Sequence, residues 1–506
     1  MGAIVMMALP LLRRKGAEAL KSNRPAPTAS EKNRRAAILA LLSFSMLIVS
    51  LDQYIVVVAL PDSARDLGYS SQTLQSVVSA YAIASSGFLL FGGRASDLLG
   101  RRRVLVFGLF LYLAASLAGG VAMSPVQQLA ARAVQGFGGA LVFPSTLALI
   151  NVRFPEGEER NRALGVWAGA GAAGLVIGVL LGGALTSAFG WRSVFLVNVP
   201  LAGLAIAAAF AIIEADGRVD RSRPFDLYGA VTVTGAITLL VIALVEGPSL
   251  GWASPWTICA LLSGTALGIA FIFIERRSVD PLLPFAMLRN AWLRLALVVA
   301  GLFMATFGAL LYFLSIFFQA VMGYDALQTG LAFLLPTAVV VVSSALAGPV
   351  VTRFGVRATM AGALAIGGLG ALALGFTLTP ETTFLRLVPG LIAISIGDGA
   401  MFTSTFIAAA TDVPDRRQGV ASGIVSTGQG IGASVGLAVL VLIANAATQG
   451  LDGEDLRIAT AQGIAHSAYA IAGGIMLTLF IVMTFRQRSV AGQQKPPITS
   501  EAGKCN

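Results

Sequence analysis

Few ionisable side chains lie inside the long apolar stretches of this chain, and three of them stand out: Asp52, Arg132 and Asp398. If such stretches cross a bilayer, a charged side chain near its centre costs about 2.5–3.5 kcal/mol, which makes it a candidate for function. Asp52 and Asp398 could each exchange a proton for a cationic ligand. The alternative is a structural pair, in which an arginine such as Arg132, or a hydroxyl group, holds a carboxylate.

Residue types for other chemistry are scarce. The chain has one histidine, His466, and two cysteines, Cys259 and Cys505, with no C-x-x-C pair. We therefore expect no metal site, no cofactor and no enzymatic activity, because a membrane enzyme such as an acyltransferase needs a His/Asp, Cys/His or metal cluster at one membrane face. The chain also lacks a G-x-x-x-x-G-K-[ST] loop for ATP, and no segment is long enough for a soluble signalling domain.

The composition indicates the elements that must position these residues. Of the 506 residues, 56% are hydrophobic and 12% are charged, and the mean hydropathy is +0.81. Soluble domains carry about 25% charged residues, so the low charged fraction of this chain indicates a protein embedded in a lipid bilayer. The net charge of +10 is spread over short loops and tails. It therefore indicates membrane topology and not nucleic-acid binding.

Apolar runs of about 20 residues are long enough to span a bilayer. We predict fourteen such spans near residues 36–60, 73–93, 104–123, 127–150, 163–187, 193–213, 226–246, 255–275, 292–320, 326–351, 357–378, 385–410, 418–446 and 464–485. With the N-terminus inside, only four basic residues fall in outside loops, and these are Arg65, Arg192, Arg386 and Arg457. The positive-inside rule therefore favours fourteen spans in the cytoplasmic membrane, with both termini cytoplasmic.

An internal repeat divides the spans into two groups of six. The segment FPST at 143–146 recurs as FTST at 402–405, and each is followed by a charged loop and a glycine-rich helix. GGRASDLLGRRR at 92–103 has a weaker echo, AGPVVTRFGVR, at 347–357. We therefore predict an all-α membrane protein built from two repeated halves, an arrangement typical of transporters. Its parts are an N-terminal tail (1–35) that is apolar up to Leu12 and polar without regular structure over 14–35, a six-helix half (36–213), two inserted helices with their linkers (214–291), a second half (292–485) and a C-terminal tail (486–506).

The loop between the second and third spans carries a recognisable motif. Its pattern, Gly93-x-x-x-Asp97-x-x-Gly100-Arg101-Arg102, resembles the loop signature of the major facilitator superfamily, with Leu98 in place of the usual first arginine. We expect a tight glycine turn, a carboxylate that meets a helix N-terminus or an arginine, and a basic anchor at the lipid headgroups. The resemblance implies the major facilitator fold and a loop that supports conformational switching.

Three further stretches are similar to the fourteen-helix drug:proton antiporter branch of that superfamily. They are LDQYIVVVALP from Leu51 to Pro61, RAVQG from Arg132 to Gly136, and the glycine pattern of Gly174, Gly178, Gly182 and Gly183. In the first stretch Tyr54 and Val57 replace a Thr and an Asn, and in the last Val179 replaces the proline. The resemblance implies that Asp52, Arg132 and Gln135 take part in proton coupling and that the glycines pack helices closely. Tyr54 could line a lipophilic binding site.

These patterns predict a proton-driven exporter of lipophilic, cationic compounds that works as a monomer by alternating access between its halves. Its partners would be protons, the small-molecule substrate and membrane lipids, and its energy source the proton gradient. The alternative is a dedicated exporter of one metabolite, self-made antibiotic or lipid-like molecule. In either case Asp52 is the better candidate for the proton carrier, because only Asp52 lies in a branch motif.

Overall fold

The computed structural model describes residues 28–69, 76–217, 226–278, 281–448 and 451–485, and within these ranges the regular structure is entirely helical. Its main helices are α2 (Ala29–Leu67), α4 (Ser76–Leu99), α5 (Arg101–Gly120), α6 (Pro125–Arg153), α7 (Glu158–Phe189), α8 (Ser193–Leu196), α9 (Asn198–Ile212), α10 (Leu227–Leu250), α11 (Pro255–Arg277), α12 (Ala291–Phe303), α13 (Ala309–Ile316), α14 (Ala326–Phe354), α15 (Val356–Thr377), α16 (Phe384–Ala410), α17 (Gln418–Ala444) and α18 (Gly453–Thr484). In lipid every backbone N–H and C=O must be bonded internally, which leaves helices as the solution for apolar runs of this length.

Helices occupy all fourteen predicted positions. Thirteen spans in the described residues are long and apolar enough to cross a membrane, and the fourteenth position is α10, whose apolar part is Tyr228–Leu244. The ninth span is continuous from Ala291 to Val321 but contains two π-helical segments, Met304–Gly308 and Phe317–Val321. The sixth span is interrupted between α8 and α9, close to Pro200.

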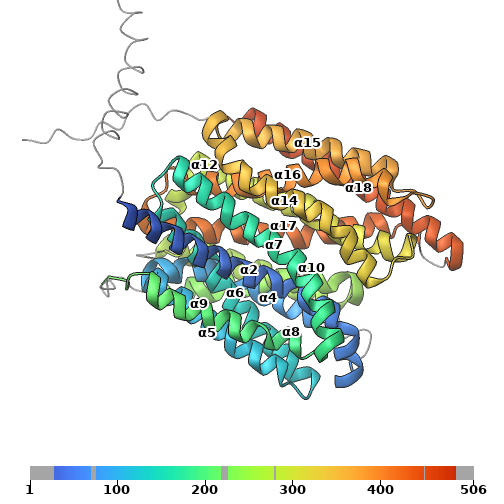
Figure 1. Cartoon of the computed structure of the whole chain (residues 1–506), viewed down its shortest axis with the longest axis horizontal. Coiled ribbons are helices and arrows are strands. Elements are labelled where there is room, and N and C mark those ends of the chain that lie inside the picture. The colour runs from blue at the N-terminus through green and yellow to red at the C-terminus, as the bar shows by residue number, and fades with distance from the viewer. Residues whose placement is uncertain (1–27, 70–75, 218–225, 279–280, 449–450, 486–506) are drawn as a thin grey trace, which may run out of the picture.

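The helices form two bundles that lie side by side. Figure 1 shows α2 to α9 on one side and α12 to α18 on the other. The largest contacts between the bundles are those of α4 with α17 and of α7 with α14. The inserted helices α10 and α11 pack on each other, and α10 also contacts α4 and α17. This is the predicted major facilitator architecture of two six-helix halves with two inserted helices.

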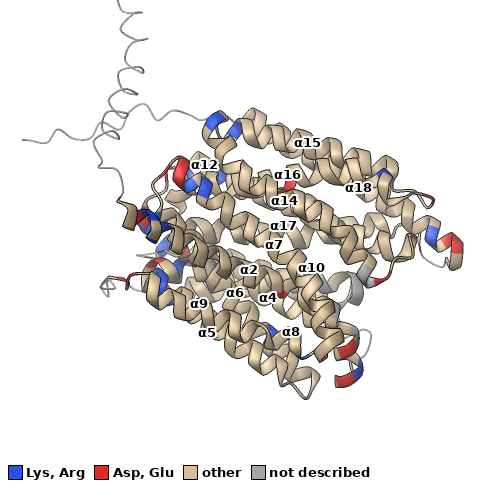
Figure 2. Ribbon diagram, in the orientation of Figure 1, with Lys and Arg blue, Asp and Glu red and all other residues tan. Residues whose placement is uncertain are grey.

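Basic side chains gather at one end of the bundle (Figure 2). We call this end the basic end; it carries the connections around Gly100, Gly157 and Gly355 and the short 3-10 helix Asp415–Arg417. Gly100 separates α4 from α5 with a φ of 103°, a backbone conformation that favours glycine. The reversal between the second and third spans therefore depends on this residue.

The prediction of an N-terminal tail without regular structure up to residue 35 was wrong in its last part. Helix α2 begins at Ala29, where Thr28 and Glu31 form a capping box that satisfies the first free N–H groups. Arg34 in its first turns pairs with Glu214 at 2.6 Å. Arg153 and Arg34 hold the pKa of the exposed Glu214 carboxyl below its ordinary value. The capping box thus starts α2 before its apolar span, and ion pairs at the basic end accompany this extension.

Candidate functional site

Asp52 lies at the centre of a buried polar network in the N-terminal half. Its Oδ2 accepts a hydrogen bond from Nη1 of Arg132 at 2.5 Å, and its Oδ1 accepts from Gln135 Nε2 at 2.9 Å and from Asn198 Nδ2 at 2.8 Å. All four residues are fully buried. The structure therefore brings together three of the predicted site residues, Asp52, Arg132 and Gln135.

Further contacts connect this network to the remaining helices of the same half. Arg132 donates to the carbonyl of Val77 at 3.2 Å, and its guanidinium lies 4.5 Å from the ring centre of Tyr81. Gln135 accepts from Arg132 at 2.8 Å and donates to Ser116 at 2.8 Å. Side chains and backbone from α2, α4, α5, α6 and α9 therefore meet at a single ion pair.

Sequence reasoning missed Asn198. The signal was present, because Asn198 is the only carboxamide in the apolar run 193–213, and a buried amide side chain needs partners. It lies at the first residue of α9, directly after the interruption that separates α9 from α8. The sixth span therefore places a hydrogen-bond donor on Asp52 near its start.

Asp398 has a different environment from Asp52. It lies at mid-length in α16 of the C-terminal half and is partly exposed. No hydrogen bond or ion pair joins its carboxylate to another residue within the described chain. Tyr54 of α2, also partly exposed, lies close enough for electrostatic interaction with Asp398. Tyr54 and Asp398, predicted separately from opposite halves, thus interact electrostatically across the interface.

Asp97 joins the two halves at the basic end. Its carboxylate accepts hydrogen bonds from the backbone N–H of Val420 at 2.9 Å and of Gly419 at 3.2 Å, in the first turn of α17. Arg101 pairs with the same carboxylate at 3.1 Å. The expected partners, a helix N-terminus and an arginine, are both present, and the negative charge suits the positive end of the helix dipole.

Among the remaining residues of the loop motif, Gly93 differs from the prediction. Gly93 lies within α4 and not in a turn, and a Cβ there would come within 2.3 Å of the carbonyl oxygen of Gly419. Arg101 and Arg102 donate to the carbonyls of Asp415 and Phe210 respectively. Within the motif only Gly100 forms the tight turn.

The weaker echo of the motif makes the corresponding contact in the other half. A Cβ on Gly348 of α14 would come within 2.3 Å of the carbonyl oxygen of Asn161, in the first turn of α7. The side chain of Asn161 donates to the hydroxyl of Thr352 at 3.0 Å. Each half therefore places a glycine of its motif against the start of a helix of the other half.

Hydrogen bonds between the halves are confined to the basic end of the described structure. They join Asp97 to Gly419 and Val420, Arg101 to Asp415, Arg160 to Ala410, and Asn161 to Thr352. At the opposite end, Arg192 bonds to Asp66 and Arg457 to Pro380, each within its own half. In the described part of the interface, hydrogen bonds therefore hold the two halves together at the basic end.

The predicted glycine motif of α7 packs against α2, with one exception. Added Cβ atoms at Gly174, Gly178 and Gly182 would come within 2.5 to 2.8 Å of backbone oxygens of α2, those of Leu47, Leu51 and Ile55. These glycines recur every fourth residue, so they form one stripe on the helix. Gly183 was wrongly included, because a Cβ there would meet no atom within 4 Å.

Comparisons with known proteins agree with this architecture. Residues 42–437 match the family model of the Major Facilitator Superfamily. The chain is 35% identical to the puromycin resistance protein of Streptomyces alboniger, with 87% of this chain and 88% of the relative aligned. It is 36% identical to the multidrug resistance protein Stp of Mycobacterium tuberculosis (80% and 75% covered) and 35% identical to the cephamycin export protein of Amycolatopsis lactamdurans (84% and 88%).

The fold also resembles that of a solved transporter. The crystal structure of the human organic anion transporter MFSD10 superposes with a TM-score of 0.65 at 16% identity, covering 88% of this chain and 99% of that one. A likeness at this identity concerns the fold alone. This protein is a multi-pass membrane transporter and not an enzyme, and it belongs to the major facilitator superfamily.

Proposed function

We propose that this chain is a proton-coupled exporter of lipophilic, cationic compounds. In this proposal it lies in the cytoplasmic membrane as a monomer, with both termini and the basic end in the cytoplasm. The export direction is supported by the relatives, which are named for drug resistance and for cephamycin export. Small hydrophobic toxins would be taken up from the inner side and released outside.

The carboxylate of Asp398 is the observation that carries the proposal for cations. It has no counter-ion among the described residues, it is partly exposed, and it lies near Tyr54 where the two halves meet. A carboxylate in an apolar environment is costly unless something compensates its charge. A cationic substrate or a proton would each do so, and the two would compete for the site.

Asp52 is the proposed proton carrier. Protonation would remove the charge that holds Arg132, Gln135 and Asn198, and the contacts of these residues reach five helices of the N-terminal half. A rearrangement of this half could then be coupled to opening at the opposite end. The proton gradient supplies the energy, since moving one elementary charge through 100 mV is worth about 2.3 kcal/mol.

A dedicated exporter of a single compound is the second candidate. The puromycin resistance and cephamycin export proteins, each named for one antibiotic, are as similar to this chain as the multidrug relative is. In that case the site between the halves would select one molecular shape and not a class of lipophilic cations.

A susceptibility panel separates these candidates. A bacterium lacking its own drug pumps would express the full chain or its Asp398→Asn variant and be tested against dyes, quaternary ammonium compounds, puromycin and neutral antibiotics. Protection against several unrelated cations supports the multidrug exporter, and protection against one compound supports the dedicated exporter. Protection against neither cations nor antibiotics, with normal expression, would contradict the proposed function.

A further inference from the structure

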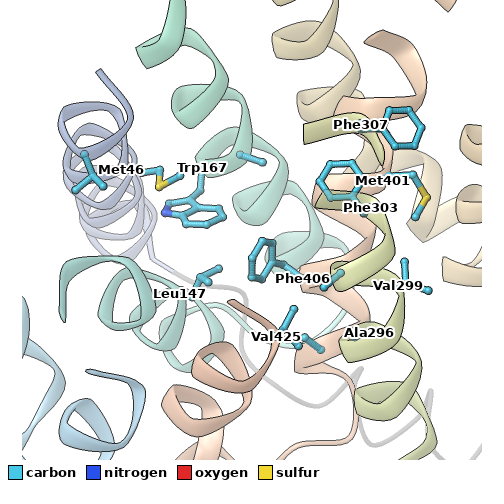
Figure 3. Packing of buried hydrophobic residues seen from close by; sticks show 14 of the residues in the cluster. Met46, Leu147, Trp167, Ala296, Val299, Phe303, Phe307, Met401, Phe406 and Val425 are labelled. Carbon is cyan, nitrogen blue, oxygen red and sulfur yellow. The ribbon is translucent and has the colours of Figure 1, made fainter. Parts of the chain in front are cut away.

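A cluster of aromatic rings lies between the two halves, in a position that the transport site does not use. The indole of Trp167 on α7 stacks on Phe402 with ring centres 6.0 Å apart and meets Phe406 edge to face at 5.5 Å, both from α16. Phe143 on α6 lies 5.3 Å from Trp167 and 5.9 Å from Phe406. Figure 3 shows Trp167 and Phe406 pointing toward each other from opposite halves, with Phe303 of α12 nearby.

The cluster lies between Asp398 and the basic end. Asp398, Phe402 and Phe406 follow one another at intervals of four residues, so they form one stripe on α16. The stripe becomes more buried toward the basic end, because Asp398 and Phe402 are partly exposed while Phe406 is 2% exposed. Trp167 is fully buried. The rings therefore close the interface on the side of the proposed cation site that faces the basic end.

The internal repeat explains how the cluster is built. Phe143 and Phe402 are the first residues of the repeated segments FPST and FTST, so the two halves contribute equivalent rings. The residue that corresponds to Trp167 in the second half is Val425, two positions after the matching glycines at 165 and 423. Only the N-terminal half carries the indole, and the second half provides small and phenyl side chains around it.

Trp167 is held in its own half by a hydrogen bond and touches the other half only through its ring. Its Nε1 donates to the hydroxyl of Thr146 at 3.1 Å, and that hydroxyl donates to the carbonyl of Phe143 at 2.7 Å. The contacts with Phe402 and Phe406 involve no polar group. They can therefore be made and broken without leaving a buried hydrogen-bonding group unpaired.

We propose that Trp167, Phe402 and Phe406 form an aromatic gate that closes the substrate path toward the basic end. The proposal rests on the proposed transport by alternating access. In the described state the rings are packed together and the interhalf hydrogen bonds at the same end are formed. When the halves separate at the basic end, the indole stays with α6 and α7 while the two phenyl rings move away with α16.

Thiol labelling tests the gate without substrate or a proton gradient. Tyr54→Cys, in a chain carrying Cys259→Ser and Cys505→Ser, places a reporter near Asp398, beyond the gate as seen from the basic end. A membrane-impermeant maleimide is then added from the basic-end face of oriented vesicles. We expect Trp167→Ala to raise the labelling rate severalfold and Trp167→Phe to leave it near that of the parent.

Trp191→Ala is the matched control, because Trp191 is also buried, donates to Asp66 and contacts Phe195, but only within the N-terminal half. It should leave labelling from the basic-end face unchanged. Phe402→Ala, at a partly exposed position, is the second variant should Trp167→Ala fail to fold, and it too should raise the rate. Unchanged labelling in folded Trp167→Ala or Phe402→Ala protein would overturn the gate. That result would leave the export proposal standing, since the susceptibility panel tests it separately.

Discussion

The carboxylate of Asp52 accepts a hydrogen bond from Arg132 at 2.5 Å, although 80 residues separate the two in the chain and neither side chain is more than 1% exposed. This geometry is compatible with both hypotheses drawn from the sequence. A proton on Asp52 would break the pair, so it can act as a coupling element. The pair also stabilises the half in which it lies, so each role needs its own measurement.

Removing Arg132 should destabilise the protein strongly. Arg132→Ala leaves the Asp52 carboxylate buried without its counter-ion, and breaking a buried pair in this way costs about 3–5 kcal/mol. Thermal unfolding of the purified full chain in detergent measures the loss. Arg192→Ala is the control, because its partner Asp66 is 47% exposed and water screens that pair. Equal losses in the two variants would contradict a structural contribution from the Asp52 network.

Asp398→Asn should abolish efflux of cations and spare neutral lipophilic substrates, because the amide keeps the size of the side chain but cannot compensate a positive charge. Initial efflux rates of a cationic dye and a neutral compound under one imposed pH gradient would show the difference. Asp62→Asn, the same change at a more exposed position, should alter neither rate. Equal loss of both substrates would argue against a cation site at Asp398.

The same assay distinguishes Asp52 from Asp398. If Asp52 carries the proton, Asp52→Asn should lose proton-driven efflux of every substrate yet retain exchange of substrate across vesicles without a gradient. The amide keeps hydrogen-bonding capacity but does not titrate. Gradient-driven efflux at the rate of the parent protein, in folded Asp52→Asn protein, would exclude Asp52 as the proton carrier.

Asp97→Asn should slow transport of all substrates to a similar degree with little change in binding affinity. The charge that meets the first turn of α17 and Arg101 is lost, while no substrate-facing group changes. Transport rates and dissociation constants for two unrelated substrates would test this. Asp216→Asn is a suitable control, because Asp216 accepts from the backbone N–H groups of Arg102 and Arg103 in the first turn of α5. A defect restricted to one substrate would point to a role in substrate choice.

Adding a methyl group to the glycine stripe of α7 should depend sharply on position. At Gly178 the new Cβ would lie 2.5 Å from the backbone oxygen of Leu51, a contact that no side-chain rotation relieves. Overpacking of this kind costs about 1–3 kcal/mol. At Gly183 the added methyl meets nothing, so Gly183→Ala should be neutral or gain up to about 1 kcal/mol from helix propensity. Comparable melting temperatures for Gly178→Ala and Gly183→Ala would refute this packing account.

The sequence by itself determined the helices and the family. Lipid forces each apolar run to satisfy its backbone within a helix, so run length and loop charge were sufficient to predict all fourteen positions. Motifs whose residues all lie in one helix or turn could also be recognised, such as the turn at Gly100 and the glycine stripe through Gly178. Asp52 and Asp398 were found because an ionisable group in an apolar run is conspicuous on its own.

Only the tertiary structure decided what these residues touch. Asn198 became part of the site because the packing of α9 against α2 brings its amide to Asp52. Gly183 belongs to the same motif as Gly178 but lies off the packed stripe. The first turns of α2 carry an arginine, Arg34, that pairs with Glu214 after the end of α9. The sequence does not single out Trp167, because an aromatic residue in an apolar helix has no distinguishing pattern. Its role in the proposed gate depends on contacts with two phenyl rings, Phe402 and Phe406, more than 230 residues away in the chain. Such contacts depend on how the surfaces of two helices fit together and not on the composition of either helix.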